Sequence, residues 1–313
     1  MSYAFDPEIA AGIALLPTLD FANFTQARIA MSERFSQLEA PDTTGVDVRD
    51  ELVPGPDGAP DVPVRIYTPH RRTVAAAIYD IHGGGFVIGG IENDHAANLR
   101  FARELGVVVV AVDYRLAPEN PYPAGLEDCH AGLVWTAKNA DTLGIDADRI
   151  ALHGISAGGG LAAALALLAR DRGGPAILFQ FLGVPEIDDR LDTPSMRAFL
   201  DTPMWNRPRA EISWDAYLGG PGRRGGADIP IHAAPARATD LSGLPPAYVT
   251  AMQFDPLRDE DIAYAQALLA AGIRTELHVF PGTFHGSALM QQAAVTQREI
   301  AESIAVLGRA FGI

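Results

Sequence analysis

Gly154-Ile155-Ser156-Ala157-Gly158 is the stretch of this sequence that decides the fold. The apolar run 149–153 before it predicts a short buried strand, and residues 159–170 after it predict a helix. Small residues at both ends of the stretch allow a strand to turn sharply into a helix, because a larger side chain would collide with its neighbours. The pattern therefore predicts a nucleophile elbow that exposes the hydroxyl of Ser156.

A glycine loop precedes this elbow in the chain. Residues 75–81 predict a strand that leads into His82-Gly83-Gly84-Gly85-Phe86. Glycine N–H groups can approach a reacting carbonyl oxygen closely, and the N–H of Ala157 is free at the start of its helix. We therefore predict an oxyanion hole from Gly83, Gly84, Gly85 and Ala157, although the sequence leaves open which two loop glycines donate. We interpret His82 as an anchor of the loop.

An acid and a base follow in the chain order that an elbow serine requires. Residues 246–251 predict a strand that delivers Asp255, and residues 275–280 predict a strand that delivers His285. Asp259 and its acidic neighbours lie in a first helical turn, where carboxylates commonly complement the helix dipole. The sequence thus predicts Ser156 as the nucleophile, His285 as the base and Asp255 as the orienting acid.

Five motifs in this order resemble those of the hormone-sensitive-lipase-like family of α/β hydrolases, the microbial family IV esterases. They are HGGGF at 82–86, YRLAPE at 114–119, GISAGG at 154–159, DPLRDE at 255–260 and the loop around His285. The resemblance implies an α/β-hydrolase fold with a mostly helical cap, no cofactor, and hydrolysis of carboxylic esters with short or medium acyl chains. It places the triad and the oxyanion donors at the residues named above. Ile155 departs from the family, which usually has an acidic residue before the nucleophile.

The length and the hydrophobic pattern agree with an α/β fold. The chain has 313 residues, of which 48% are hydrophobic, enough for one large core. The run 106–112 is continuously apolar, as in strands covered on both faces of a parallel sheet. Helical patterns separate the expected strands, at 94–105, 124–143, 159–170, 259–271 and 286–310. We therefore expect a mainly parallel sheet covered by helices on both faces.

Two segments fall outside this alternation and predict a cap. Residues 1–45 contain an amphipathic, helix-like stretch before a first strand expected near Val62, and residues 188–220 are rich in aromatic side chains and methionine. Residues 46–187 and 221–313 form the catalytic core in this division. We expect the two cap segments to meet above Ser156. Candidate pocket residues are Phe86, Ile155, Met204, Trp205 and Trp214; the alternative is that such aromatic residues only pack the cap on the core.

Charge and cysteine content limit the partners and the compartment. The formal net charge of −15 disfavours nucleic acid and anionic membrane surfaces. Cys129 is the single cysteine, so no intrachain disulfide forms and a reducing compartment is expected. Without a signal-like segment or a long apolar run, we expect a cytoplasmic protein without stable membrane association. No metal is expected, because no residues have ligand spacing.

A small-molecule ester is the expected partner, and the resemblance adds a homodimer as an option. Two other functions stay open. An amidase or an acyltransferase would use the same acyl-serine chemistry. The fold also hosts non-catalytic receptors for small molecules, but these lose a triad residue, and all three are present here.

Overall fold

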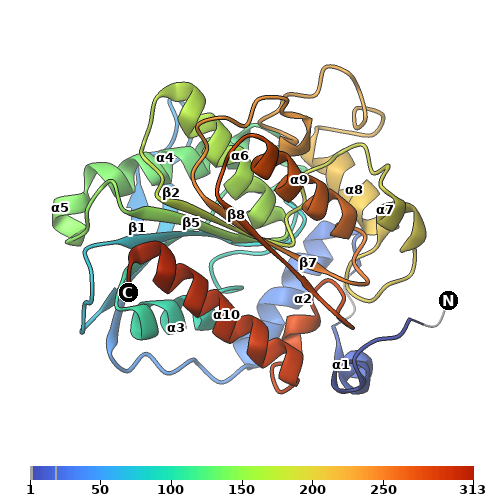
Figure 1. Cartoon of the computed structure of the whole chain (residues 1–313), viewed down its shortest axis with the longest axis horizontal. Helices are drawn as coiled ribbons and strands as arrows, with labels where there is room; N and C mark the ends of the chain where they lie inside the picture. The colour runs from blue at the N-terminus through green and yellow to red at the C-terminus, as the bar shows by residue number, and fades with distance from the viewer. Residues whose placement is uncertain (1–2, 18–19) are drawn as a thin grey trace.

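The computed structural model describes residues 3–17 and 20–313, and Figure 1 shows it as a cartoon. Its strands are β1 (Val46–Val53), β2 (Val62–Pro69), β3 (Ala77–Ile81), β4 (Val108–Val112), β5 (Ile150–Ile155), β6 (Phe179–Gly183), β7 (Ala247–Met252) and β8 (Thr275–Phe280). Its helices are α1 (Pro7–Gly12), α2 (Phe24–Gln37), α3 (His95–Leu105), α4 (Ala124–Lys138), α5 (Ala140–Leu143), α6 (Ala157–Arg172), α7 (Pro194–Ala198), α8 (Arg207–Tyr217), α9 (Arg258–Ala270) and α10 (Ala294–Phe311). Short 3₁₀ turns are η1 (Ile13–Leu15), η2 (Pro235–Arg237) and η3 (Ser287–Leu289).

The described strands form one sheet in the order β1-β2-β4-β3-β5-β6-β7-β8. β1 pairs with β2 and β2 with β4 in antiparallel fashion, whereas every pair from β4 through β8 is parallel. Parallel neighbours need crossover connections, and the helices between the strands supply them. The carboxyl ends of β5, β7 and β8 therefore lie at the same edge of the sheet, where the elbow and the loops with Asp255 and His285 begin.

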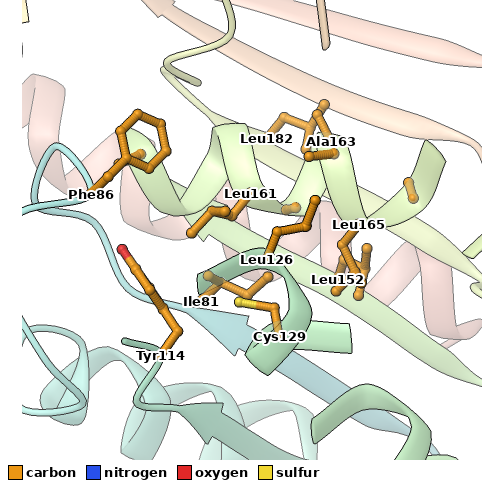
Figure 2. Packing of buried hydrophobic residues seen from close by; sticks show 14 of the residues in the cluster. Ile81, Phe86, Tyr114, Leu126, Cys129, Leu152, Leu161, Ala163, Leu165 and Leu182 are labelled. Carbon is orange, nitrogen blue, oxygen red and sulfur yellow. The ribbon is translucent and has the colours of Figure 1, made fainter. Parts of the chain in front are cut away.

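Helices cover both faces of this sheet. α3 and α10 lie on one face, whereas α4, α6 and α9 lie on the other (Figure 1). The buried side chains form a cluster on each face, one with α3 and α10 and a larger one with α4, α6 and α9. In the larger cluster, Cys129 of α4 packs near Ile81 and Leu126, and it is a buried free thiol (Figure 2). The mainly parallel sheet with helices on both faces agrees with the fold predicted from the sequence.

The first strand lies earlier than expected from the sequence. We expected it near Val62, but β1 begins at Val46 and pairs along its whole length with β2. β1 is one of the two edge strands of the described sheet, and most of its positions are exposed or half-buried. Its charged residues therefore hide the hydrophobic pattern by which a strand is recognised.

Three expected helices also differ in extent. The stretch 124–143 is broken at Asn139, whose side-chain amide donates to the carbonyl of Trp135. The stretch 286–310 becomes helical only at Ala294, because Gly286 adopts a φ of +84° and a 3₁₀ turn follows it. The helix-like stretch expected within residues 1–45 contains α1, η1 and α2 rather than one helix, and residues 18–19 between η1 and α2 lie outside the described part.

The two segments predicted as a cap touch one another. The rings of Phe21 and Trp205 have centroids 5.5 Å apart, and the guanidinium of Arg209 lies 5.3 Å from the centroid of Phe21. Phe21 and Trp205 also line the same cavity as Ser156. The segment boundaries 1–45 and 188–220 themselves stay a prediction.

Candidate active site

Ser156 sits at the sharp turn between β5 and α6. Its backbone has φ +60° and ψ −126°, a conformation that costs a non-glycine residue on the order of 1–3 kcal/mol. The turn is held by its own backbone, since the Ser156 N–H donates to the carbonyl of Gly183 at 2.8 Å and its carbonyl accepts from the N–H of Gly160 at 2.9 Å. The sequence-predicted elbow is therefore present in the expected strand–turn–helix context.

Glycine is sterically required on both sides of this serine. A Cβ on Gly154 would lie 2.2 Å from the carbonyl oxygen of Gly158, and a Cβ on Gly158 would lie 1.9 Å from the carbonyl oxygen of Ile81. Both contacts are to backbone, which cannot move aside as a flexible side chain could. The close approach of α6 to β3 thus depends on Gly158.

Gly158→Ala is expected to destabilise the fold by about 3 kcal/mol, the upper end of the usual cost of overpacking, because the new methyl group collides with the backbone where α6 approaches β3. Urea unfolding followed by circular dichroism measures this loss. Gly308→Ala in α10 is the matched control: its Cβ would meet no atom closer than 3.3 Å, and alanine is favoured in a helix. A Gly158→Ala protein as stable as Gly308→Ala would contradict the steric argument.

Ser156, His285 and Asp255 form one chain of hydrogen bonds. The Oγ of Ser156 lies 2.8 Å from Nε2 of His285, and Nδ1 of His285 lies 2.7 Å from Oδ2 of Asp255. With the proton on Nδ1, the histidine donates to Asp255 and its Nε2 accepts from the serine. Asp255 is fully buried, and its other oxygen accepts from the N–H of Leu257 at 3.0 Å. The structure therefore brings together the three residues that the sequence analysis selected from separate loops.

Other carboxyl groups are buried in the core, and the negative charge of Asp255 acts on two of them, Glu186 and Asp261. Burial raises the pKa of Glu186, Glu260 and Asp261 well above the usual carboxyl range, which favours their neutral forms. Asp259, by contrast, is half-buried: Arg258 pairs with its Oδ1, and its Oδ2 accepts from the N–H of Ser195. Among the described residues, Asp255 is the carboxylate that contacts His285.

The glycine loop faces the same serine. The carbonyl of Gly83 accepts from Nδ1 of His82 at 2.8 Å and from Nδ2 of Asn93 at 3.3 Å, while the carbonyl of Gly84 accepts from the N–H of Ile88 at 3.0 Å. The ring of His82 stacks on Tyr114 with centroids 4.2 Å apart. His82 thus contacts the loop backbone as the sequence analysis interpreted it.

A cavity of about 570 Å³ opens on this site. Three of the five predicted pocket residues, Ile155, Met204 and Trp205, line it together with Gly83, Gly84, Gly85, Ser156 and His285. The other two do not: Trp214 is fully buried, and Phe86 stacks on Tyr217 with ring centroids 4.0 Å apart. Figure 2 shows Phe86 in the core cluster near Leu161. Phe86 and Trp214 therefore fit the alternative given above, in which such aromatic residues only pack and do not line the pocket.

A protein-family model described as the alpha/beta hydrolase fold matches residues 78–289 of the chain, which include the glycine loop, the elbow, Asp255 and His285. The chain belongs to the α/β hydrolases, in their hormone-sensitive-lipase-like family. The carboxylesterase NlhH of Mycobacterium tuberculosis is 41% identical to this hydrolase. The aligned part covers 81% of this chain and 80% of the relative. The arylesterase of Saccharolobus solfataricus is 34% identical over 90% of this chain and 91% of the relative.

Solved structures agree with the sequence relatives. A bacterial heroin esterase superposes with a TM-score of 0.94 at 47% identity, covering 98% of each chain. A structure of an arylesterase superposes with a TM-score of 0.84 at 31% identity, covering 99% of this chain and all of the other. The described fold of this α/β hydrolase is therefore shared along nearly its whole length with known esterases.

Several cavity residues of this α/β hydrolase were not foreseen. Met31, Arg34 and Phe35 of α2 line the cavity, as do Asn93 and Asp94 just before α3. No spacing in the sequence relates these residues to Ser156, because the fold brings α2 over the sheet edge and the 89–94 loop beside the glycines. Two coarser signals pointed to these places: α2 lies within the segment 1–45 that was expected above Ser156, and residues 89–94 follow the glycine loop closely.

Three further findings concern features of this hydrolase beyond the triad. Ile155, the departure from the family pattern, contacts β6 so closely that a Cβ on Gly183 would lie 2.1 Å from its Cδ1. Within residues 3–17 and 20–313, no cluster of three or more His, Cys, Asp or Glu is arranged to hold a metal ion. None of the helices described is both long and apolar enough to span a bilayer.

Proposed function

We propose that this α/β hydrolase is a serine carboxylesterase that acts through an acyl-Ser156 intermediate on esters of short or medium acyl chain. The observation that carries the proposal is the continuous hydrogen-bonded chain from Asp255 through His285 to Ser156, which opens on a largely apolar cavity. The names of the relatives, carboxylesterase and arylesterase, support an ester rather than an amide as the substrate.

In the acylation step the Oγ of Ser156 attacks the ester carbonyl carbon, and its proton moves to Nε2 of His285. Asp255 holds the proton on Nδ1 and stabilises the imidazolium that forms. When the tetrahedral intermediate collapses, the C–O bond to the alcohol breaks and His285 returns its proton to the leaving oxygen. Water then attacks the acyl-serine with His285 as base, releasing the acid and restoring Ser156.

The N–H groups of Gly84, Gly85 and Ala157 are the proposed donors to the oxyanion. In a trans peptide the N–H points opposite to the preceding carbonyl. The carbonyls of Gly83 and Gly84 accept hydrogen bonds from other residues of the protein. The N–H groups of Gly84 and Gly85, which belong to the same two peptide units, therefore point in the opposite direction and stay available to the oxyanion. Ala157 begins α6, where its N–H has no partner within the helix. In this assignment Gly83 allows the loop to pack closely against β5, since a Cβ there would lie 2.8 Å from the carbonyl oxygen of Ile155.

The substrate meets an apolar surface in the cavity. Ile155, Met204 and Trp205 contribute to it, and the ring of Trp205 lies 5.7 Å from that of His285. Burial of acyl or alcohol carbons against these side chains supplies binding free energy of about 25 cal/mol per Å². We propose these three residues as part of the substrate pocket.

The test is to catch the acyl-enzyme. Rapid mixing with p-nitrophenyl butanoate is expected to release a burst of nitrophenol close to one equivalent per active site, provided that deacylation is slower than acylation. Mass spectrometry of acid-quenched enzyme is expected to find the butanoyl group on the peptide that contains Ser156. Butanoylation of another residue, or a Ser156→Ala protein that hydrolyses the ester at a rate comparable to the wild type, would overturn the proposal.

A cytoplasmic location and a homodimer complete the proposal. The location is supported by the single cysteine, a buried free thiol whose pKa burial raises well above its usual value, so that it is protected from oxidation. The homodimer was suggested by the family resemblance. Both stay predictions, the second of which is open to analytical ultracentrifugation.

A further inference from the structure

One wall of the cavity carries two hydrogen-bond acceptors that no donor of the described protein satisfies. Oδ1 of Asn93 and Oδ2 of Asp94 are both buried without a hydrogen-bond partner. The orientation of the Asn93 amide follows from its other atom, because Nδ2 donates to the carbonyl of Gly83 at 3.3 Å. Both residues line the same cavity as Ser156. Two unsatisfied acceptors thus belong to residues of the cavity wall, although both oxygen atoms are themselves covered in the described structure.

The Asp94 carboxyl has no evident structural task. Asp94 occupies the N-cap position of α3, where an aspartate side chain normally accepts from a backbone N–H of the first turn. Here the side chain makes no such bond, and only the backbone carbonyl of Asp94 accepts, from the N–H of Asn98 at 2.8 Å. Helix formation thus leaves the carboxyl group available to the cavity.

No positive charge of the described protein compensates this acid. Burial, and to a smaller extent the negative charge of Asp80, raises the pKa of Asp94 well above its usual value. Arg34 also lines the cavity, but it lies on α2 with an exposed side chain, so water and salt screen its charge. A carboxyl group without a compensating cation, beside a second unsatisfied acceptor, favours a ligand that carries positive charge and donates hydrogen bonds.

We propose that Asn93 and Asp94 form a subsite for a protonated amine carried by the ester substrate. The proposal rests on the esterase function proposed above. The ammonium N–H donates to Oδ2 of Asp94, a second N–H where present donates to Oδ1 of Asn93, and the alkyl carbons pack on the apolar cavity wall. The bound cation favours the carboxylate form of Asp94, so any proton that the carboxyl group holds passes to water as the ion pair forms.

The test compares esters that differ by one charge. Dimethylaminoethyl butanoate and isopentyl butanoate are nearly the same shape, but only the first is a cation at pH 7. The methyl esters of 4-(dimethylamino)butanoic acid and 5-methylhexanoic acid place the same difference on the acyl side. For each pair, pH-stat titration gives kcat/KM, and the ratio of the charged to the neutral ester is the readout. This ratio cancels any general effect of a variant on folding or on the triad.

In the wild type, at least one of the two ratios is expected to exceed that of Asp94→Asn by about 10- to 100-fold, the range for a hydrogen bond to a charged group. Asn has the shape of Asp without the charge. Glu92→Gln is the matched control: Glu92 is exposed two residues away and does not line this cavity, so its removal changes the net charge equally and is expected to preserve the ratio.

Equal ratios in the wild type and Asp94→Asn for both pairs would overturn the subsite. So would an equal fall in Glu92→Gln, because the preference would then come from the overall field of the protein. Isothermal titration of Ser156→Ala with the four esters separates this from the proposed function. If the wild type hydrolyses none of them, the esterase proposal fails, yet tighter binding of a charged ester that Asp94→Asn abolishes in the same background would still support the subsite.

Discussion

Ser156→Ala is expected to lower kcat for a short-chain aryl ester by about a million-fold, the scale observed when a triad nucleophile is removed. The alanine lacks the Oγ that lies 2.8 Å from Nε2 of His285, so no acyl-enzyme can form. The oxyanion donors and the cavity stay in place and leave a residual rate above that of water alone. Steady-state kinetics with p-nitrophenyl butanoate, at enzyme concentrations high enough to detect the residual rate, measures the loss.

Ser287→Ala is the control for this experiment. Ser287 lies two residues after His285, and its hydroxyl is buried without a hydrogen-bond partner in the described structure. Its removal is therefore expected to leave kcat within a few-fold of the wild type. If Ser156→Ala retained turnover comparable to Ser287→Ala, with both proteins folded by circular dichroism, Ser156 would not be the nucleophile.

The sequence allowed the fold and the hydrogen-bonded triad to be predicted because both depend on local patterns. Ser156, Asp255 and His285 each follow a strand by a few residues, and in a parallel sheet the ends of such strands meet at one edge. The glycines around Ser156 are equally readable, since only glycine fits where Gly158 approaches the carbonyl of Ile81. Spacing and residue size were enough for these features.

The cavity walls depend on tertiary packing and could not be predicted in this way. Phe86 was predicted to line the pocket beside the glycine loop, and Trp214 as part of the aromatic-rich segment 188–220. In the structure Phe86 packs on Tyr217 and Trp214 is fully buried. Asp94 has the sequence of a helix N-cap, so nothing in its pattern indicates that it lines the cavity of Ser156. Whether such a residue lines the cavity or packs in the core depends on contacts with residues that are distant in the sequence.

The sequence offered more than one candidate for the acid that orients His285, and the distances in the structure distinguish between them. Asp259 was the closest alternative to Asp255, within the same DPLRDE motif. In the structure Asp259 is engaged elsewhere, by the side chain of Arg258 and the backbone N–H of Ser195. Asp255 alone among the described carboxylates lies within hydrogen-bond distance of His285, at 2.7 Å.

Asp255→Asn is accordingly expected to lower kcat by about 10⁴-fold. The amide of asparagine can donate to Nδ1 of His285, which moves the imidazole proton to Nε2 and leaves no lone pair there to accept the proton of Ser156. Asp259→Asn removes the same charge four residues away and is expected to change kcat by less than about tenfold, mainly through the contact with Ser195. Steady-state kinetics on both variants decides between them: a large loss in Asp259→Asn with little in Asp255→Asn would assign the orienting acid to Asp259.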